Sequence, residues 1–215
     1  MLYACTLRSG ELGGLTWDGT DLSEEAIVND RAYVSVTKEI ARLYKDDLKS
    51  TKTEVYYTFP SFKPQSKTAL VLKRPKTDQS IRKVYLPKSL ALALLEHRKQ
   101  QAAHIKALGK EYHDYNLVFA QHNGLPYSGK ILSSRFKNLL RDIGMREVDY
   151  YSLRHSGATA KLRNTHNIKS VQADMGHSTA KMLMDVYAGI VDEDRVNNAR
   201  VMEEILFSDE STENK

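Results

Sequence analysis

The stretch RKVYLPKSLALALL, residues 82–95, changes its pattern at Pro87 and decides the fold class. Before the proline, the run from Arg82 to Leu86 is rich in β-forming residues; after it, apolar residues recur at helical spacing as far as Leu108. Proline favours the start of a helix and is unfavourable within a strand. The chain therefore passes at this point from a strand-forming part to a helical part.

On the amino-terminal side of Pro87, three further runs are typical of strands, and they lie between clusters of proline and lysine. With residues 82–86 they predict one small antiparallel sheet built from residues 32–36, 54–59 and 69–72. The polar stretch from Lys45 to Lys67 is expected to be a long hairpin extension or loop. The first fifteen residues read as a helix that ends at Gly13 and Gly14.

On the carboxyl-terminal side, the pattern stays helical to residue 206. Gly144 and Gly176 are expected to end two of the helices, and Ser152 to cap another. The expected helices are residues 133–143, 152–163, 168–175, 179–187 and 192–206. The predicted class is α+β, a mainly helical bundle with a small antiparallel β-sheet in the amino-terminal half, forming one domain.

Composition excludes several classes of protein. The chain has 215 residues, of which 41% are apolar and 27% charged, as in an ordinary globular domain. Its longest apolar run, residues 90–95, is far shorter than the roughly 20 residues of a membrane span. Residues 1–7 lack the pattern of a secretory signal, and the single cysteine, Cys5, forms no internal disulfide. The cytoplasm is the expected compartment.

Charge is distributed unevenly along the chain. Residues 1–191 hold 29 Lys and Arg against 19 Asp and Glu, a net charge of +10, whereas residues 192–215 hold 3 against 8, a net charge of −5. Between Lys38 and Lys88, 13 basic residues stand against 5 acidic ones. A basic surface of this kind attracts nucleic acid, although a solvated lysine-rich surface would have the same composition.

Three segments carry residues suited to phosphate chemistry. In YYSLRHSGAT, residues 150–159, a cap at Ser152 would put Arg154 and His155 in the first turn of a helix, where an anion is favoured. Alternatively, the side chain of Arg154 extends into solvent and binds no anion. Segment 175–179 leads into a helix that ends near Tyr187, and residues 73–83 read as a lysine-rich hairpin tip. Taken alone, each of these residues is more often structural.

These segments together resemble the tyrosine recombinase, or phage integrase, family. The resemblance rests on three blocks in the family's order: LYACTLRSGELGGLTW at residues 2–17, PKTDQSIRKVYLP at 75–87, and YSLRHSGAT with MGHSTAKMLMDVY across 151–187. Each block alone is weak. Three in order, framing most of the chain, are specific.

Carried over position by position, the resemblance implies a role for five residues. Arg8 and Arg154 would bind the scissile phosphate, and Lys76 would be the general acid. His177 would donate a hydrogen bond to the phosphate, and Tyr187 would be the nucleophile that forms a covalent 3′-phosphotyrosyl link. The implied reaction needs no metal ion, no cofactor and no external source of energy.

Further residues have supporting roles in this interpretation. Glu11, one turn from Arg8, is expected to orient the site. Tyr151 stands where the family usually has a histidine or lysine, and a phenol with a pKa of about 10 is a poor general base. His155 is a nearby candidate for the general base, but its spacing from the other residues does not support that role. Generic DNA-phosphate contacts are expected from Lys73, Arg74, Arg82 and Lys83.

Family members usually carry an amino-terminal DNA-binding domain and earlier catalytic helices, and here the first block begins almost at Met1. We therefore expect residues 1–190 to be a catalytic domain without its first helices and without that DNA-binding domain. Residues 191–215 would be a carboxyl-terminal helix and acidic tail, exchanged between protomers. The expected partner is double-stranded DNA, bound by a homo-oligomer that is a tetramer in the synaptic complex of the full-length protein and a monomer in this fragment.

The implied function is that of a site-specific recombinase, an integrase of a mobile genetic element such as a phage, acting on DNA in a prokaryotic cytoplasm and not at a membrane. Two alternatives remain open. A catalytically degenerate DNA-binding module would account for Tyr151, and a type IB topoisomerase-like relaxase would share the nucleophile chemistry. A metal-dependent nuclease is disfavoured because the seven histidines show no ligand spacing.

Overall fold

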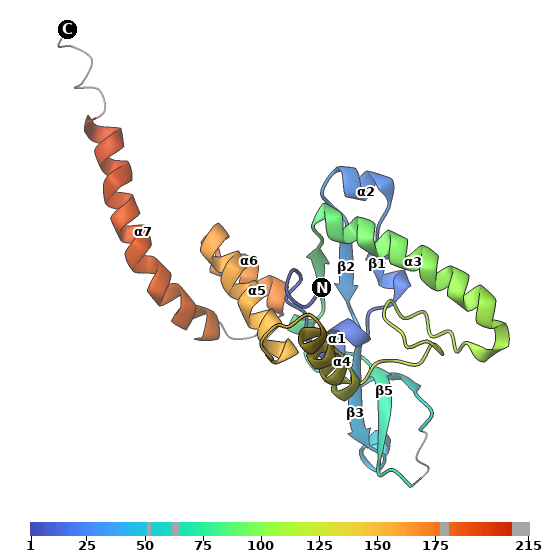
Figure 1. Ribbon diagram of the computed structural model, residues 1–215. Coiled ribbons are helices and arrows are strands. Elements are labelled where there is room, and N and C mark those ends of the chain that lie inside the picture. Colours follow the sequence, from blue (N-terminus) through green and yellow to red (C-terminus); the bar gives the residue numbers. More distant parts are fainter. Residues whose placement is uncertain (51–52, 62–64, 177–180, 208–215) are drawn as a thin grey trace.

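The computed structural model describes residues 1–50, 53–61, 65–176 and 181–207 (Figure 1). Its helices and strands confirm the predicted α+β class. The helices are α1 (Ser9–Gly13), α2 (Glu24–Val28), α3 (Lys88–Leu108), α4 (Gly129–Asp142), α5 (Tyr150–Thr165), α6 (Ile168–Met175) and α7 (Lys181–Phe207). The strands are β1 (Thr20–Asp21), β2 (Tyr33–Val36), β3 (Glu39–Tyr44), β4 (Val55–Thr58), β5 (Thr68–Lys73) and β6 (Arg82–Tyr85).

The strands form two three-stranded antiparallel sheets, in the orders β1-β2-β6 and β3-β5-β4, where one sheet was expected. In the first, Val34 of β2 faces Val84 of β6; in the second, Ile40 of β3 faces Leu72 of β5. Because β5 and β6 belong to different sheets, residues 74–81 connect the sheets and are not a hairpin tip, so that prediction is wrong. Strand β3, absent from the prediction, pairs with β5 on the edge opposite β4.

The main hydrophobic core lies between the first sheet and α1, α2 and α3. Val34, Val36 and Val84 are fully buried, and Ala91 and Leu94 of α3 belong to the same cluster. Alternation along β6 puts Val84 inward and leaves Lys83 and Tyr85 exposed. Burial of each valine or leucine contributes about 1.5–3 kcal/mol, so this cluster fixes the sheet against α3.

Helices α5 and α6 pack against each other through a smaller cluster of four buried residues: Ala158, Leu162, Val171 and Met175. Helix α6 has the predicted bounds and ends at Gly176, whose φ of +59° is in the left-handed region. Helix α5 begins earlier than predicted, because the side chain of Asp149, not Ser152, caps it by accepting from the backbone N–H of Tyr151 at 2.7 Å. Arg154 consequently lies in the second turn, beyond the free N–H groups on which the anion argument depended.

Helix α7 is continuous over Lys181–Phe207, where two helices were expected at 179–187 and 192–206. Gly189 does not interrupt it, because one glycine costs only about 1 kcal/mol relative to alanine inside a helix. The helix contacts α5 and α6 and then extends away from the other elements (Figure 1). Six apolar side chains of its far half are exposed: Val196, Val201, Met202, Ile205, Leu206 and Phe207. No described helix is long and apolar enough to cross a membrane.

Candidate active site

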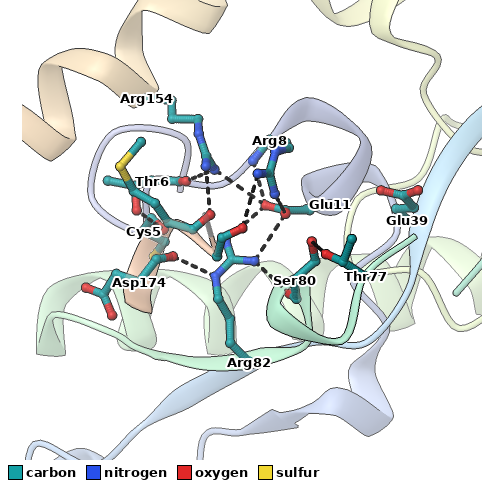
Figure 2. A network of polar contacts seen from close by, with 12 residues as sticks. Cys5, Thr6, Arg8, Glu11, Glu39, Thr77, Ser80, Arg82, Arg154 and Asp174 are labelled. Carbon is teal, nitrogen blue, oxygen red and sulfur yellow. Dashed lines mark hydrogen bonds and ion pairs between the residues drawn. The ribbon is translucent and has the colours of Figure 1, made fainter. Parts of the chain in front are cut away.

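Glu11 of α1 is fully buried and lies at the centre of the candidate site (Figure 2). Its oxygens accept from the side chains of two arginines, Arg8 and Arg82, and a third, Arg154, forms an ion pair with it. A buried carboxylate is strongly unfavourable unless it is paired and hydrogen-bonded, so this cluster accounts for its position in the core.

Arg8 immediately precedes α1 and is the most exposed of the three arginines, with 33% of its side chain accessible. Its Nη1 lies 2.5 Å from Glu11 Oε1, and its backbone N–H donates to Glu11 Oε2 at 2.8 Å, so the carboxylate satisfies a free N–H group at the start of the helix. Its Nη2 donates to the backbone oxygen of Gly176 at 3.2 Å. The local fold of α1 thus fixes both the arginine and its carboxylate.

Arg154 of α5 is fully buried. Its Nη1 donates to the backbone oxygen of Thr6 and lies 3.6 Å from Glu11 Oε2, and its Nη2 donates to the backbone oxygen of Met175 at 2.7 Å. Thr6 has a φ of +50°, which is strained for a β-branched residue, in the turn that presents this carbonyl. The Nε of Arg154 has no hydrogen-bond partner among the described residues. A buried donor left unpaired in this way suits an external acceptor.

Arg82 of β6 is the third member of the cluster, and its side chain is only 7% accessible. Its Nη1 and Nη2 meet the two oxygens of Glu11 at 3.1 and 3.0 Å, a bidentate arrangement. Its Nε donates to the backbone oxygen of Asp174 at 2.6 Å, and its Nη1 also donates to that of Ser80 at 2.9 Å. The sequence predicts that Arg82 contacts DNA phosphate. In the structure its guanidinium donates to acceptors of the protein: Glu11, Asp174 and Ser80.

The three arginines converge on the carboxyl end of α6. The backbone oxygens of Asp174, Met175 and Gly176 accept, in that order, from Arg82, Arg154 and Arg8. The last carbonyls of a helix have no partner within the helix, and cations are favoured at this end. The arginines therefore tie the start of α1, β6 and α5 to residues 174–176, which directly precede His177.

The cluster carries three guanidinium groups and one carboxylate, so its formal charge is +2. Burial alone would raise the pKa of Glu11, but hydrogen bonds and positive charge from Arg82 and Arg8 outweigh it and hold the pKa below the ordinary 4.5. Burial, together with the charges of Arg8 and Arg82, lowers the pKa of Arg154 to about 10, against the opposing effect of Glu11. At neutral pH the site keeps an excess of positive charge that favours an anion.

Lys76 lies on the 74–81 connection between the two sheets and is exposed. The connection is anchored at its start, where Lys73 Nζ donates to Glu39 Oε1 and to the backbone oxygen of Arg74. Arg82 anchors its end. The structure therefore places Lys76 on a segment held at both ends, outside the cluster of buried arginines.

The four expected DNA-phosphate contacts divide into two kinds. Lys73 is buried and the side chain of Arg82 is only 7% accessible, and each forms an ion pair with a carboxylate of the protein, Glu39 and Glu11 respectively. These ion pairs compete with contact to DNA phosphate, which stays a prediction for both. Arg74 and Lys83 are exposed, and for them the role stays a prediction. Arg74 lies 2.9 Å from Asp78, and Lys83 lies over the ring of Tyr33 at 4.2 Å.

The remaining candidates lie on the helices that follow. Tyr151 is 44% exposed in the first turn of α5, and its ring meets that of His155 edge-on, with 4.9 Å between centroids. Tyr187 is part of α7, and His177 lies outside the described residues. The structure thus brings Arg8 and Arg154 into contact with Glu11, and the roles given to all the candidates stay predictions.

Arg82 is the residue whose role sequence reasoning missed. A signal was present, because residues two apart in a strand point to the same face, and Arg82 shares its face with Val84. An arginine on the inward face of a strand must find a buried acceptor. Among the described residues, no group of three or more His, Cys, Asp or Glu is placed to hold a metal ion.

Comparisons with known proteins agree on one family. The model of the phage integrase family matches residues 1–193. A protein named tyrosine recombinase XerC-like from Caldanaerobacter subterraneus is 24% identical over 210 residues, which are 96% of this chain and 48% of that protein. Prophage integrase IntR from Escherichia coli is 28% identical over 201 residues, 87% of this chain and 41% of that protein. The chain thus spans about half the length of these relatives, or less.

Solved structures show the same fold. The integrase of transposon Tn1549, in complex with transposon right end DNA, matches with a TM-score of 0.65 and 20% identity, over 95% of this chain and 56% of that one. The XerA recombinase matches with a TM-score of 0.58 and 16% identity, over 92% of this chain and 55% of that one.

Proposed function

Because this chain belongs to the phage integrase family, we propose that it forms the catalytic part of a site-specific DNA recombinase of a mobile genetic element, which cleaves and rejoins DNA through a covalent 3′-phosphotyrosyl intermediate. The observation that carries the proposal is the arginine cluster on Glu11, with its formal charge of +2 and with the Nε of buried Arg154, which no acceptor of the described residues meets. Relatives named recombinase and integrase support the reaction class.

In the proposed cleavage step, the phenol oxygen of Tyr187 attacks the scissile phosphorus and the bond from phosphorus to the 5′-oxygen breaks. Lys76 gives a proton to the departing 5′-oxygen, and the phenolic proton passes to water. The step conserves the number of phosphate ester bonds, so it reverses when a 5′-hydroxyl attacks the phosphotyrosine, without an oxidant or an energy source. Rejoining is this reverse step.

Arg8 and Arg154 act in this proposal on the non-bridging oxygens, where negative charge grows in the transition state. Guanidinium groups already fixed by protein contacts need little reorganisation to meet that charge, which makes them effective electrostatic catalysts. Their attachment to Glu11 and to the end of α6 supplies this fixation. His177, which follows Gly176, would add a hydrogen bond to the same oxygens.

Double-stranded DNA is the proposed substrate. Two solved relatives are described as complexes with DNA, the Tn1549 integrase with transposon right end DNA and XerH with a palindromic difH substrate, and the basic stretch from Lys38 to Lys88 suits a polyanion. Residues 1–190 form the proposed catalytic domain, acting in the cytoplasm of a prokaryote. The exposed apolar side chains of α7 support a homo-oligomer in which residues 191–215 meet another protomer.

Covalent trapping tests this proposal. The chain is incubated, without divalent metal, with a library of nicked duplexes that carry a randomised central sequence, and adducts that survive denaturation are captured and sequenced. We expect an enriched sequence with the parent chain and no adduct with Tyr187→Phe, while Tyr151→Phe keeps the adduct. DNA that is bound and never captured covalently by the parent chain would favour a degenerate DNA-binding module.

A further inference from the structure

We propose that Arg82 is a positioning residue: by neutralising Glu11 it leaves the guanidinium groups of Arg8 and Arg154 available to a phosphodiester. The inference rests on the proposed function, since it concerns how the same site meets its substrate. It assigns to Arg82 an action through its neighbours, without contact to the DNA.

The contacts of Arg82 set it apart from the other two arginines. Its guanidinium takes both oxygens of Glu11, at 3.1 and 3.0 Å, whereas that of Arg8 meets Oε1 alone, through Nη1 at 2.5 Å. Arg154 meets one oxygen at 3.6 Å, beyond hydrogen-bond distance. The Nε and Nη1 of Arg82 have further acceptors in two backbone oxygens. Arg82 therefore forms a complete bidentate salt bridge, while the Nε of Arg154 has no acceptor in the part of the chain that the structure describes.

The packing around Arg82 holds it in this place. A Cβ atom added to Gly176 would lie 2.7 Å from Arg82 Nη1 and 3.0 Å from its Cζ. The guanidinium thus fills the space beside the end of α6 that a side chain at position 176 would need. Its side chain is 7% accessible, so solvent does not compete for Glu11.

Charge explains why this bridge matters for the site. A phosphodiester carries one negative charge, and the transition state of its cleavage concentrates further charge on the non-bridging oxygens. With Glu11 neutralised by Arg82, Arg8 and Arg154 contribute their two positive charges to the substrate. Without Arg82, the buried carboxylate has to be neutralised by these two, because a buried charge without a partner is strongly unfavourable. The Nη2 of Arg8 and the donors of Arg154, which now meet backbone oxygens, would then turn towards Glu11.

Single-turnover cleavage of the trapped duplex measures this effect. Arg82→Met is expected to slow adduct formation about 100-fold at saturating DNA, the scale of a small displacement of catalytic groups, with the half-saturating DNA concentration unchanged. Arg82→Lys, which keeps the charge but not the bidentate geometry, should fall between this variant and the parent. The control is Lys99→Met, an exposed position on α3 that should cleave at the parental rate.

A double variant separates positioning from a merely structural role. If Arg82 acts by neutralising Glu11, then Arg82→Met combined with Glu11→Gln removes the carboxylate that diverts the other arginines, and cleavage should recover at least about 10-fold over Arg82→Met alone. A loss caused by general damage to the fold would deepen in the double variant. A parental rate for Arg82→Met, or no recovery in the double variant, would overturn the proposal.

Phosphate binding tests the inference without any cleavage. Inorganic phosphate is titrated into ¹⁵N-labelled protein while the Nε–H resonances of Arg8 and Arg154 are followed. We expect phosphate to shift both resonances in the parent chain and to shift them much less in Arg82→Met. In the double variant of Arg82→Met and Glu11→Gln, the shifts should be restored. Equal shifts in the parent and Arg82→Met would contradict the inference even if no DNA adduct forms. Absence of an adduct in the presence of these shifts would count against the proposed function alone.

Discussion

Arg154 Nη1 lies 3.6 Å from Glu11 Oε2, and both side chains are fully buried. Arg154, one of the two arginines proposed to bind the phosphate, is thus part of the protein interior and is joined to the backbone oxygens of Thr6 and Met175. Substitutions at this site should consequently change the free energy of unfolding as well as activity. The two effects can be measured separately.

Arg154→Met is expected to lower the free energy of unfolding, because it removes the buried donors to the backbone oxygens of Thr6 and Met175. Each backbone oxygen left without its donor costs about 1–3 kcal/mol. Urea unfolding measures the loss. Arg74→Met, which removes an exposed ion pair with Asp78, is the matched control and should leave the midpoint unchanged. An equally small effect for both variants would contradict the structural role of Arg154.

Glu11→Gln should make the unfolding free energy less dependent on pH in acid. The pKa of Glu11 is lowered in the folded chain, so its contribution to stability is fully present above the ordinary 4.5 and is lost as pH falls through the folded-state pKa. The stability gap between the parent and Glu11→Gln is therefore expected to be widest near neutral pH and to narrow below 4.5. Urea titrations from about pH 7 to about pH 3 test this.

The control for that series is Glu96→Gln, at an exposed position of α3 where the carboxylate meets only Gln100 among the contacts of the described residues. This substitution should leave the pH dependence of the parent unchanged. A gap for Glu11→Gln that stays constant down to acid would mean that the folded-state pKa of Glu11 is not lowered.

Gly157→Ala is expected to destabilise the chain by about 1–3 kcal/mol, the range for overpacking a filled interior. A Cβ atom at this position of α5 would lie 2.0 Å from the backbone oxygen of Tyr3, which cannot rotate away. Because Arg154 is one turn earlier on α5, cleavage should fall as well. Gly129→Ala, where the nearest atom is the hydroxyl oxygen of Tyr150 at 3.4 Å, is the control and should keep both properties. Thermal unfolding that shows equal stability for the two variants would refute the close contact.

Lys76→Met is expected to slow cleavage about 100-fold without changing the unfolding midpoint, because Lys76 is exposed and its proposed role is proton transfer. A duplex with sulfur in place of the 5′-bridging oxygen releases a thiol with a pKa of about 8.5, which departs without a proton donor. This substrate should restore the rate for Lys76→Met and leave Arg82→Met slow. If the sulfur substrate does not restore the cleavage rate of Lys76→Met, Lys76 is not the general acid.

Much of the fold could be predicted because local patterns determine it. The change at Pro87 marked the start of α3, and Gly176 ended α6 where expected. Strand pairing could not be predicted in the same way, since β3 lacks a strict alternation of polar and apolar residues, buries only Ile40 and resembles an exposed segment. Without β3, the pairing of β5 was open, and two sheets were taken for one.

The candidate site was predicted by residue type but not by environment. Resemblance to the family pointed to Arg8 and Arg154, which the structure brings together on Glu11. Basic residues in a row do not reveal which of them is buried, so Arg82 and Lys73 were grouped with Arg74 and Lys83 as surface contacts. Burial depends on how β6 and β5 pack, and this is settled only by the assembled sheets.

Identifying the residue that carries DNA tests the central claim most directly. The chain contains 12 tyrosines, and digestion of a trapped adduct with trypsin and nuclease, followed by tandem mass spectrometry, determines which one is modified. The account predicts a phosphonucleotide on Tyr187 and nowhere else, with no modification in Arg154→Met. A nucleotide on Tyr151 or on any other tyrosine would contradict it.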